Sequence, residues 1–495
     1  MKKKFSIIVA LVLLVVLAVA FTGCNKYEWQ SIGGGDANAD VLSNGGYAVE
    51  QGNYVYFVNG FQGTTAENDW GNVFKQGIMR ATLDENGAVV ADSFALVVPK
   101  HIYSSDTNSG IAVFGEWIYY ATPNNEKDKS GTASTTNLDF MRTKIDGSIT
   151  QKIYTLANRS YPYIFTPSRI LYYNANVIYA IDFSGMKTSK NISDGSGAYR
   201  TELVTSVNSY TWKYDTNYSL AQSSAASDYI IYTTATTDQA QAHRNCNELN
   251  IIKVDGSGKK NLAKFDTYTI DYKIALIDSV IENDNIFTIY YTKTKLVGST
   301  DTIEGVFCNK VQISDLSFDV ATEKQLTASN QTKVFPLSYE KGALITDTTD
   351  SFIYYLNGTA GTAETYSQKV IGKTTATVQF VAEVEGKDYV YYTDSASAKS
   401  LYRINLIENE GKNANEALVL TAGTIKLDWT KLDIIKKGAR IDFFYFNTDD
   451  YSYLHRVNVA AFDGSTKITE SDLFGKMTDA DIATKKAAEE AAAKA

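Results

Sequence analysis

The chain has 495 residues, a formal net charge of −9 and 44% hydrophobic residues, enough to bury a large core. A net negative globule is a poor partner for nucleic acid, and no basic run with interleaved aromatic residues offers a local exception. Only three His residues are present, so we expect neither a metal centre nor a cofactor.

The N-terminus has the three parts of a secretion signal: lysines at positions 2–4, an apolar run over residues 5–21, and a short segment before Cys24. The ending Phe21-Thr22-Gly23-Cys24 resembles the lipobox of bacterial lipoproteins, whose Cys is acylated and becomes the new N-terminus. This resemblance implies that residues 1–23 are a lipoprotein signal peptide and that Cys24 is lipidated. Lipid would then hold the protein at the outer face of a membrane, in the bacterial cell envelope. Ordinary secretion with an unmodified Cys24 is the alternative.

Residues 24–46 contain two glycine-rich stretches, at 33–35 and 44–46. They predict a flexible tether of about 20 residues with a reach of roughly 25 Å. Loss of the three signal lysines would take the formal charge from −9 to −12, so the lipid rather than charge would provide the membrane contact.

A short run of aromatic and β-branched residues recurs eight times over residues 47–465. Such side chains fit a packed, pleated surface, so each run predicts a buried strand. The eight runs lie at 54–57, 117–120, 170–173, 229–232, 287–291, 352–355, 389–392 and 443–446.

A second strand follows most of these runs and ends in a turn marked by Gly or Asp. Its apolar and polar residues alternate, which is typical of a strand with one buried face. The clearest examples lie at 79–84, 141–146, 252–255, 402–406 and 455–459.

The intervals between runs, from 37 to 64 residues, favour the blades of a β-propeller with loop insertions. The expected fold is therefore all-β, with about seven to eight four-stranded blades over residues 47–465. Segments 122–138, 194–219 and 234–247 are rich in Ser, Thr, Asn and Asp and are expected to be surface loops.

One repeat allows a more specific comparison. Tyr391-Tyr392-Thr393-Asp394, followed by residues 401–406, resembles the Tyr-Trp-Thr-Asp repeat of low-density-lipoprotein-receptor-type propellers and the related repeats of bacterial envelope lipoproteins. The other repeats keep the aromatic residues and mostly lose the Asp, so the resemblance implies the fold alone.

Residues 466–495 form a linker and an Ala-rich segment, where Thr478 and Asp481 resemble a helix capping box. A short helix with almost no apolar stripe is marginal alone. We expect a solvated helical tail; a docking helix is the alternative.

Few residues suggest chemistry. Cys246 and Cys308 could form a disulfide in an oxidising compartment or remain two thiols. His243 and Cys246 alone are weak evidence for zinc. Asp146-Gly147-Ser148 and Asp255-Gly256-Ser257 follow predicted strands and are expected to be turns, and no nucleophile-elbow motif occurs, so we name no catalytic residue.

Aromatic residues in polar segments are the best candidates for ligand binding. Trp70, Trp212 and Tyr214 lie beside Asn, Asp or Thr, where they could stack on a sugar or anchor a protein partner. The alternative is that these segments fold back and bury the rings. The sequence thus favours a membrane-anchored extracytoplasmic binding module for an envelope protein or polysaccharide. A propeller-type glycoside hydrolase or lyase and an envelope assembly scaffold are the alternatives.

Overall fold

In the computed structural model, the described part of the chain runs from residue 31 to residue 474 with internal gaps. The gaps are at 60–76, 92, 104–109, 125–130, 132–133, 188–196, 213–216, 219–227, 236–246, 267–269, 284–285, 298–299, 329–332, 337–342, 347–352, 356–375, 385–386, 395–399, 406–416, 421–426, 439, 448–452 and 459–471. The signal peptide, Cys24, Trp70, Tyr214, Cys246 and the C-terminal helical segment therefore lie outside the described residues.

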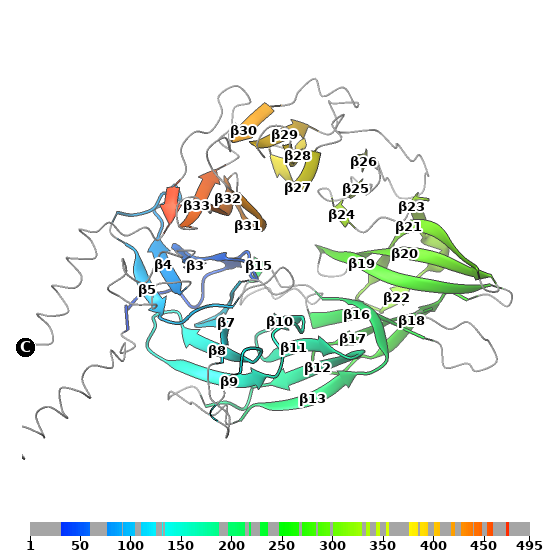
Figure 1. The fold of residues 1–495 in the computed structure, drawn as a ribbon, viewed down its shortest axis with the longest axis horizontal. Coiled ribbons are helices and arrows are strands. Elements are labelled where there is room, and N and C mark those ends of the chain that lie inside the picture. The colour runs from blue at the N-terminus through cyan, green and yellow to red at the C-terminus, as the bar shows by residue number, and fades with distance from the viewer. Residues whose placement is uncertain are drawn as a thin grey trace, which may run out of the picture.

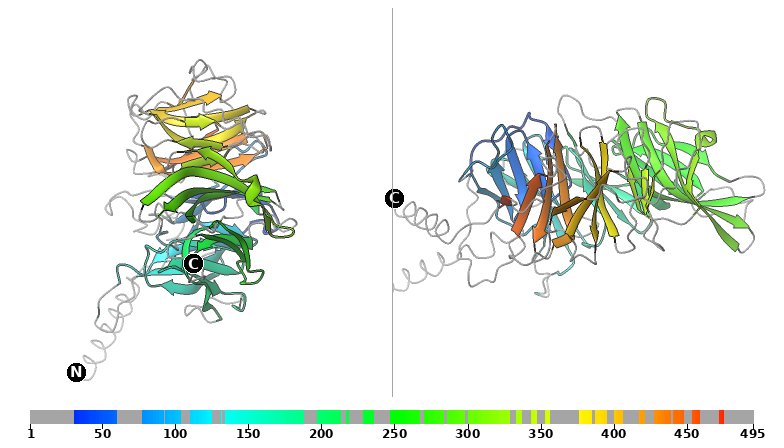
Figure 2. Two further views of the ribbon diagram at one scale, coloured as in Figure 1. Left: turned by 90° about the vertical axis from the view of Figure 1, so that its right-hand side faces the viewer. Right: turned by 90° about the horizontal axis from the view of Figure 1, so that it is seen from above.

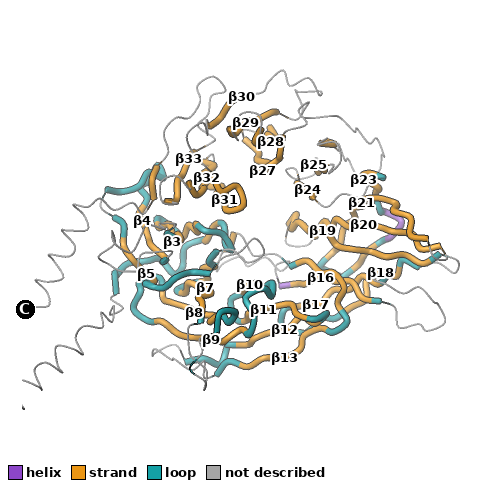
Figure 3. Tube along the Cα trace, viewed as in Figure 1, coloured by secondary structure: helices purple, strands orange, loops and turns teal. Residues whose placement is uncertain are grey.

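Eight antiparallel sheets follow one another around a common centre (Figure 1), and we number them as blades 1–8 in chain order. Seven sheets have four or more described strands, and the sixth has three. Figure 2 shows the ring edge-on as a flattened body, and Figure 3 shows that strands make up most of what is described. The predicted all-β propeller is confirmed, and the helix found in the described segments is the short 3-10 turn η3 (Val320–Thr322).

The first four blades come from the N-terminal half of the chain. Blade 1 contains β1 (Val41–Leu42), β2 (Ala48–Gln51), β3 (Tyr54–Val58), β4 (Ile78–Thr82) and β5 (Ala95–Val98). Blade 2 contains β6 (Ala112–Phe114), β7 (Trp117–Pro123), β8 (Leu138–Lys144) and β9 (Thr150–Leu156). Blade 3 contains β10 (Tyr163–Phe165), β11 (Arg169–Asn174), β12 (Val177–Asp182) and β13 (Tyr199–Val204). Blade 4 contains β14 (Val207–Thr211), β16 (Tyr229–Thr234), β17 (Glu248–Lys253) and β18 (Lys260–Lys264).

The remaining four blades complete the ring. Blade 5 contains β19 (Asp271–Asn283), β20 (Ile286–Val297), β21 (Thr300–Gln312), β22 (Ser317–Phe318) and β23 (Lys324–Thr327). Blade 6 contains β24 (Lys333–Pro336), β25 (Ala343–Thr346) and β26 (Ile353–Tyr355). Blade 7 contains β27 (Ala376–Val384), β28 (Lys387–Asp394), β29 (Ser400–Asn405) and β30 (Ala417–Leu420). Blade 8 contains β31 (Leu427–Lys437), β32 (Arg440–Asn447), β33 (Tyr453–Asn458) and β34 (Asp472–Phe474).

All eight aromatic runs contribute to strands, as the repeat predicts. Six of them form the second strand of a blade, and β3 has the equivalent place in blade 1, where β1 precedes β2 as an additional strand. The run at 352–355 is different, because it contributes β26, the third described strand of blade 6. The five predicted partner strands each pair with one of these seven strands: β4, β8, β17, β29 and β33.

The partner strands are more buried than their alternating pattern predicts. Neighbouring blades stack face to face, so both faces of a middle strand are covered, and the arginines at the polar positions are only 5–7% exposed: Arg80, Arg142, Arg403 and Arg456. Each of the first three guanidinium groups lies over an aromatic ring, at 4.3–4.6 Å from the ring centroid. The predicted solvent-facing side of these strands is instead a contact between blades.

The two faces of the ring carry different connections. Turns between the third and fourth strands lie on one face, which we call the Asp-turn face, because an Asp side chain accepts a backbone N–H two residues later at Asp84, Asp146, Asp182, Asp255 and Asp315. Connections between the second and third strands lie on the opposite face, which we call the loop face. The predicted loops 122–138 and 234–247 fall between β7 and β8 and between β16 and β17, on the loop face.

The predicted surface loop 194–219 is wrong. This segment contains β13 and β14, and also β15 (Asn217–Tyr218), which pairs with β1 of blade 1. Strand β15 therefore lies beside β1 in the sheet of blade 1, although the preceding strand β14 belongs to blade 4. A polar composition predicted exposure here, whereas long-range backbone pairing holds the segment.

The propeller also begins earlier than residue 47. Val41 and Leu42 form β1, and Ile32 packs against the core cluster of blades 1 and 2. The Ile32 backbone N–H donates to Asp146 O at 2.8 Å. Residues 31–46, predicted as part of the flexible tether, are thus attached to the Asp-turn face near blades 1 and 2.

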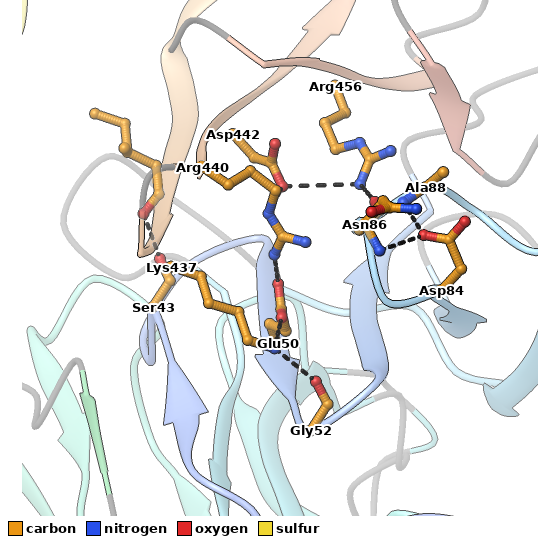
Figure 4. Close-up of polar contacts among 12 residues, drawn as sticks. Ser43, Glu50, Gly52, Asp84, Asn86, Ala88, Lys437, Arg440, Asp442 and Arg456 are labelled. Atoms are coloured by element: carbon orange, nitrogen blue, oxygen red, sulfur yellow. Dashed lines mark hydrogen bonds and ion pairs between the residues drawn. The ribbon is translucent and has the colours of Figure 1, made fainter. Parts of the chain in front are cut away.

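The ring closes between blades 8 and 1 without a shared sheet among the described strands. Figure 4 shows Glu50 of blade 1 between Lys437 and Arg440 of blade 8. The Arg456 Nη1 donates to Gly87 O at 2.6 Å, in the first Asp turn of the next blade. Side-chain contacts therefore provide the closure.

Candidate interaction surface

A row of stacked tyrosines covers the side of blade 3 that faces blade 2. The ring centroids of Tyr161 and Tyr172 are 6.2 Å apart at 9°, and those of Tyr172 and Tyr179 are 4.9 Å apart at 15°. Arg200 lies over Tyr179 at 5.0 Å and its Nη1 donates to the Tyr172 hydroxyl at 3.5 Å. Burial raises the pKa of Tyr172. Tyr172 is buried at 4% exposure, Tyr161 and Tyr179 are half-buried, and the exposed Arg200 forms the outer end of the row.

A second aromatic row lies on the opposite side of blade 3, toward blade 4. The Tyr173 and Tyr210 rings are 4.8 Å apart, and the Tyr210 and Trp212 rings are 4.4 Å apart. The Tyr173 hydroxyl donates to Asn176 Oδ1 at 3.0 Å. Burial raises the pKa of Tyr210, and all three rings remain half-buried.

The local sequence explains why both rows are on one blade. Tyr172 and Tyr173 are consecutive in β11, so their side chains point to opposite sides of the sheet. The two-residue turn at Ala175 and Asn176, both with positive φ (48° and 64°), sets the register that pairs Tyr172 with Tyr179. Blade 3 therefore presents an aromatic face to each neighbour.

The outermost strand of this blade is unusually open. Residues 199–202 of β13 are all exposed, and Tyr199 has an exposed fraction of 57%. At the Asp-turn end, Arg169 Nη2 lies 2.8 Å from Asp182 Oδ2. Although burial raises the pKa of Asp182, hydrogen bonds from Ser184 and the Arg169 charge together lower it. The Asp182 carboxylate therefore stabilises this turn through its contacts with Arg169 and Ser184.

Of the three aromatic residues predicted from sequence, Trp212 can be placed. It packs at the edge of the cluster between blades 3 and 4, so it is neither a free loop residue nor fully buried. Trp70 and Tyr214 lie outside the described residues. The segment with Trp70 joins β3 to β4 and leaves from the loop face, whereas Trp212 follows β14 at the Asp-turn face. The strand ends that flank these positions thus belong to opposite faces.

Sequence reasoning did not single out Tyr161, Tyr179 or Arg200. Tyr172 was predicted to be buried in a strand, which its 4% exposure confirms, whereas Arg200 lay inside the segment predicted to be a loop. A two-residue turn at 175–176 would have placed Tyr172 opposite Tyr179, but Ala is a weak signal for that turn.

A second cluster of polar and aromatic groups surrounds a buried lysine of blade 5. Lys293 Nζ lies 2.8 Å from Glu323 Oε2, and both side chains are 12% exposed. The rings of Phe265, Tyr272 and Phe307 surround the ammonium at 4.8–5.7 Å. The protein's own lysine satisfies this cage, so we interpret the cluster as structural.

The described residues include no group of three or more His, Cys, Asp or Glu side chains that could hold a metal ion. Cys308 lies half-buried in β21, while Cys246 is outside the described residues, so their pairing stays a prediction. Within the described part of the chain, no helix is long and apolar enough to span a membrane.

No protein-family model matches the chain, and no curated protein matches it either. Solved structures similar to it are all distant. A putative 6-phosphogluconolactonase from Bacteroides uniformis is 13% identical with a TM-score of 0.31, covering 65% of this chain and 82% of its own. The periplasmic gluconolactonase of Pseudomonas aeruginosa is 8% identical with a TM-score of 0.31, and the match covers 63% of this chain and 80% of the gluconolactonase. A prolyl endopeptidase is 9% identical with a TM-score of 0.40, covering 74% and 49%. Likenesses this weak carry no argument about ligand or activity, and the class that the fold defines is the β-propeller.

Proposed function

We propose that the protein is a lipid-anchored, extracytoplasmic binding module of the bacterial cell envelope that recognises a glycan or a protein partner. The observation that carries the proposal is the pair of aromatic rows on blade 3, in which every ring except the buried Tyr172 is half-buried, with the exposed Arg200 at the end of one row. Flat aromatic faces with a few oriented polar groups suit sugar rings and the side chains of partner proteins.

The attachment of residues 31–46 supports an orientation on the membrane. Seven residues lie between a lipidated Cys24 and Ile32, which is fixed at the Asp-turn face. The chain from Cys24 to Ile32 spans at most about 28 Å when fully extended. The Asp-turn face near blades 1 and 2 would then lie toward the lipid, and the loop face would point away.

The anchor is tested by metabolic labelling with a fatty-acid probe. The wild-type protein should be labelled and Cys24→Ala should not. Equal labelling of both would refute the anchor and leave the binding proposal to stand separately.

The binding surface is tested with purified variants against a polysaccharide panel and a solubilised envelope extract. Tyr179→Ala and Trp212→Ala should each weaken binding by about 1–3 kcal/mol. Tyr402→Ala is the matched control, because this half-buried tyrosine stacks on Tyr392 in blade 7, far from the proposed surface. Unfolding of Trp212→Ala without any change in binding would remove Trp212 from the surface. Product release from a polysaccharide would favour the hydrolase or lyase alternative.

A further inference from the structure

The outer edge of blade 3 differs from those of blades 1, 2 and 4. In β5 and β9 several residues are buried, and β18 begins and ends with lysines, which discourage strand pairing. In β13, residues 199–202 are exposed on both faces, and β12 is the only strand that pairs with it within the described sheet. Figure 1 shows β13 along the outer rim.

The sequence of β13 is complementary to itself. The central residues are Arg200, Thr201 and Glu202, all exposed. If a second copy pairs antiparallel about Thr201, Arg200 of each copy lies opposite Glu202 of the other. Tyr199 then lies opposite Leu203, an aromatic–aliphatic pair that sheets favour. Parallel pairing, or an antiparallel shift that centres Arg200, would place like charges opposite each other.

We infer that the protein forms a two-fold symmetric dimer by antiparallel pairing of β13 with β13 of a second copy, joining the two third blades into one sheet. A two-fold contact must be self-complementary, which the Arg200 and Glu202 spacing satisfies. The inference does not depend on the proposed ligand-binding role. Because β12 and β13 run side by side along the rim in the view down the short axis, both copies would turn the same face toward a membrane.

The test measures the mass of the full-length, detergent-solubilised protein by sedimentation velocity across a concentration series. Arg200→Glu and Glu202→Arg should each raise the dimer dissociation constant at least about tenfold, and the double exchange should restore it to within about threefold. Thermal unfolding checks that the single variants remain folded, as expected for exposed side chains. Monomeric wild type, a dimer that survives either single reversal, or a monomeric double variant would overturn the inference.

A crosslink gives a second readout. At the two-fold axis the Thr201 Cβ atoms of the two copies would be about 4.5–5.5 Å apart, so Thr201→Cys should form an intermolecular disulfide under mild oxidation. Lys259→Cys, in the exposed turn before β18, is the control and should not crosslink beyond background. Equal crosslinking of both variants would also contradict the pairing.

Discussion

The junction between blades 8 and 1 is closed by charged side chains, whereas the junction between blades 1 and 2 is joined by neutral hydrogen bonds. At the first, Glu50 is 1% exposed and pairs with Arg440 and with Lys437, whose Nζ is 2.6 Å away. Asp433 accepts the backbone N–H groups of Tyr47 and Ala48.

At the second junction, the backbone of residues 45–46 exchanges two 2.8 Å hydrogen bonds with Ile111. The side chain of Asn44 adds a pair of bonds to Val113, at 2.7 and 3.0 Å. Blades 1 and 2 adjoin in the chain, so local pairing forms them. Blades 8 and 1 are nearly 390 residues apart, and their junction must offset a larger loop-closure entropy with side-chain contacts.

Both junctions nevertheless share one contact. An arginine of the third strand reaches a carbonyl in the next blade's Asp turn, Arg80 to Ile145 O at 3.4 Å and Arg456 to Gly87 O at 2.6 Å. The repeat itself therefore supplies part of the closure, and the charged groups are added where the chain does not connect the blades.

The largest effect should follow from removing the closing blade. Deletion of residues 437–465 eliminates β32 and β33, exposes the faces of two blades and should unfold or aggregate the whole domain. Deletion of residues 478–495 should leave the thermal transition nearly unchanged. A folded, monomeric product of the larger deletion, seen by calorimetry and light scattering, would show that closure is dispensable.

Glu50→Gln sharpens the comparison at single-residue scale. It removes the buried carboxylate that Lys437 and Arg440 share, whereas Arg440 keeps its ion pair with Asp442 at 2.9 Å. The free energy of unfolding should fall by about 3 kcal/mol. Glu116→Gln removes the exposed pair with Lys144 and should cost less than about 1 kcal/mol. Similar denaturation midpoints for both variants would mean that the closing charges contribute little.

Gly110→Ala probes the neutral junction. Gly110 has φ +79°, and a Cβ there would lie 1.8 Å from Gly46 O. The strain of an alanine in the left-handed region and the overpacking against Gly46 should together lower the free energy of unfolding by about 2–3 kcal/mol. Gly115→Ala is the control, with φ +57° and its nearest neighbour at 4.0 Å, and should cost about 1 kcal/mol. Equal costs in chemical denaturation would argue against a tight approach between blades 1 and 2.

The closing junction should also make the stability of the protein depend on pH. Burial raises the pKa of Asp433 to about 7, despite the two backbone N–H groups that favour its ionised form. The pKa of an Asp side chain in the unfolded chain is about 3.9, so between about pH 4 and 7 only the folded protein keeps the proton on this carboxyl group. Its contribution to stability is present at low pH and lost as pH rises through 7, by at most about 1.4 kcal/mol per unit. The stability difference between wild type and Asp433→Asn should therefore fall over this range and then level off; parallel profiles would refute the shifted pKa.

Much of the fold was predictable because strands have local signatures. The aromatic runs at 54–57 and 389–392 form buried strands as expected, since β-branched and aromatic residues favour a buried, pleated position. The buried positions of Arg80 and Arg456 were not predictable. An alternating pattern predicts that one face of the strand is exposed to solvent, and it does not reveal that a neighbouring blade covers that face.

The candidate surface was predictable only in part. A binding role for Trp212 stays a prediction, and its contact with Tyr210 was not predictable, because it depends on β14 packing beside blade 3. Composition could not separate the segment 194–219 into strands, since β13 is a polar edge strand and β15 is held by pairing with a strand more than 170 residues earlier.

The sequence by itself determined the all-β class, most of the recurring buried strands, the Asp turns and the signal-like ending at Cys24, because each depends on neighbours within a few residues. Only the tertiary structure decided how the ring closes, which arginines join blades, and why β15 reaches β1. These contacts join residues far apart in the chain, and their free energy must exceed the entropy of closing long loops, which no local pattern encodes.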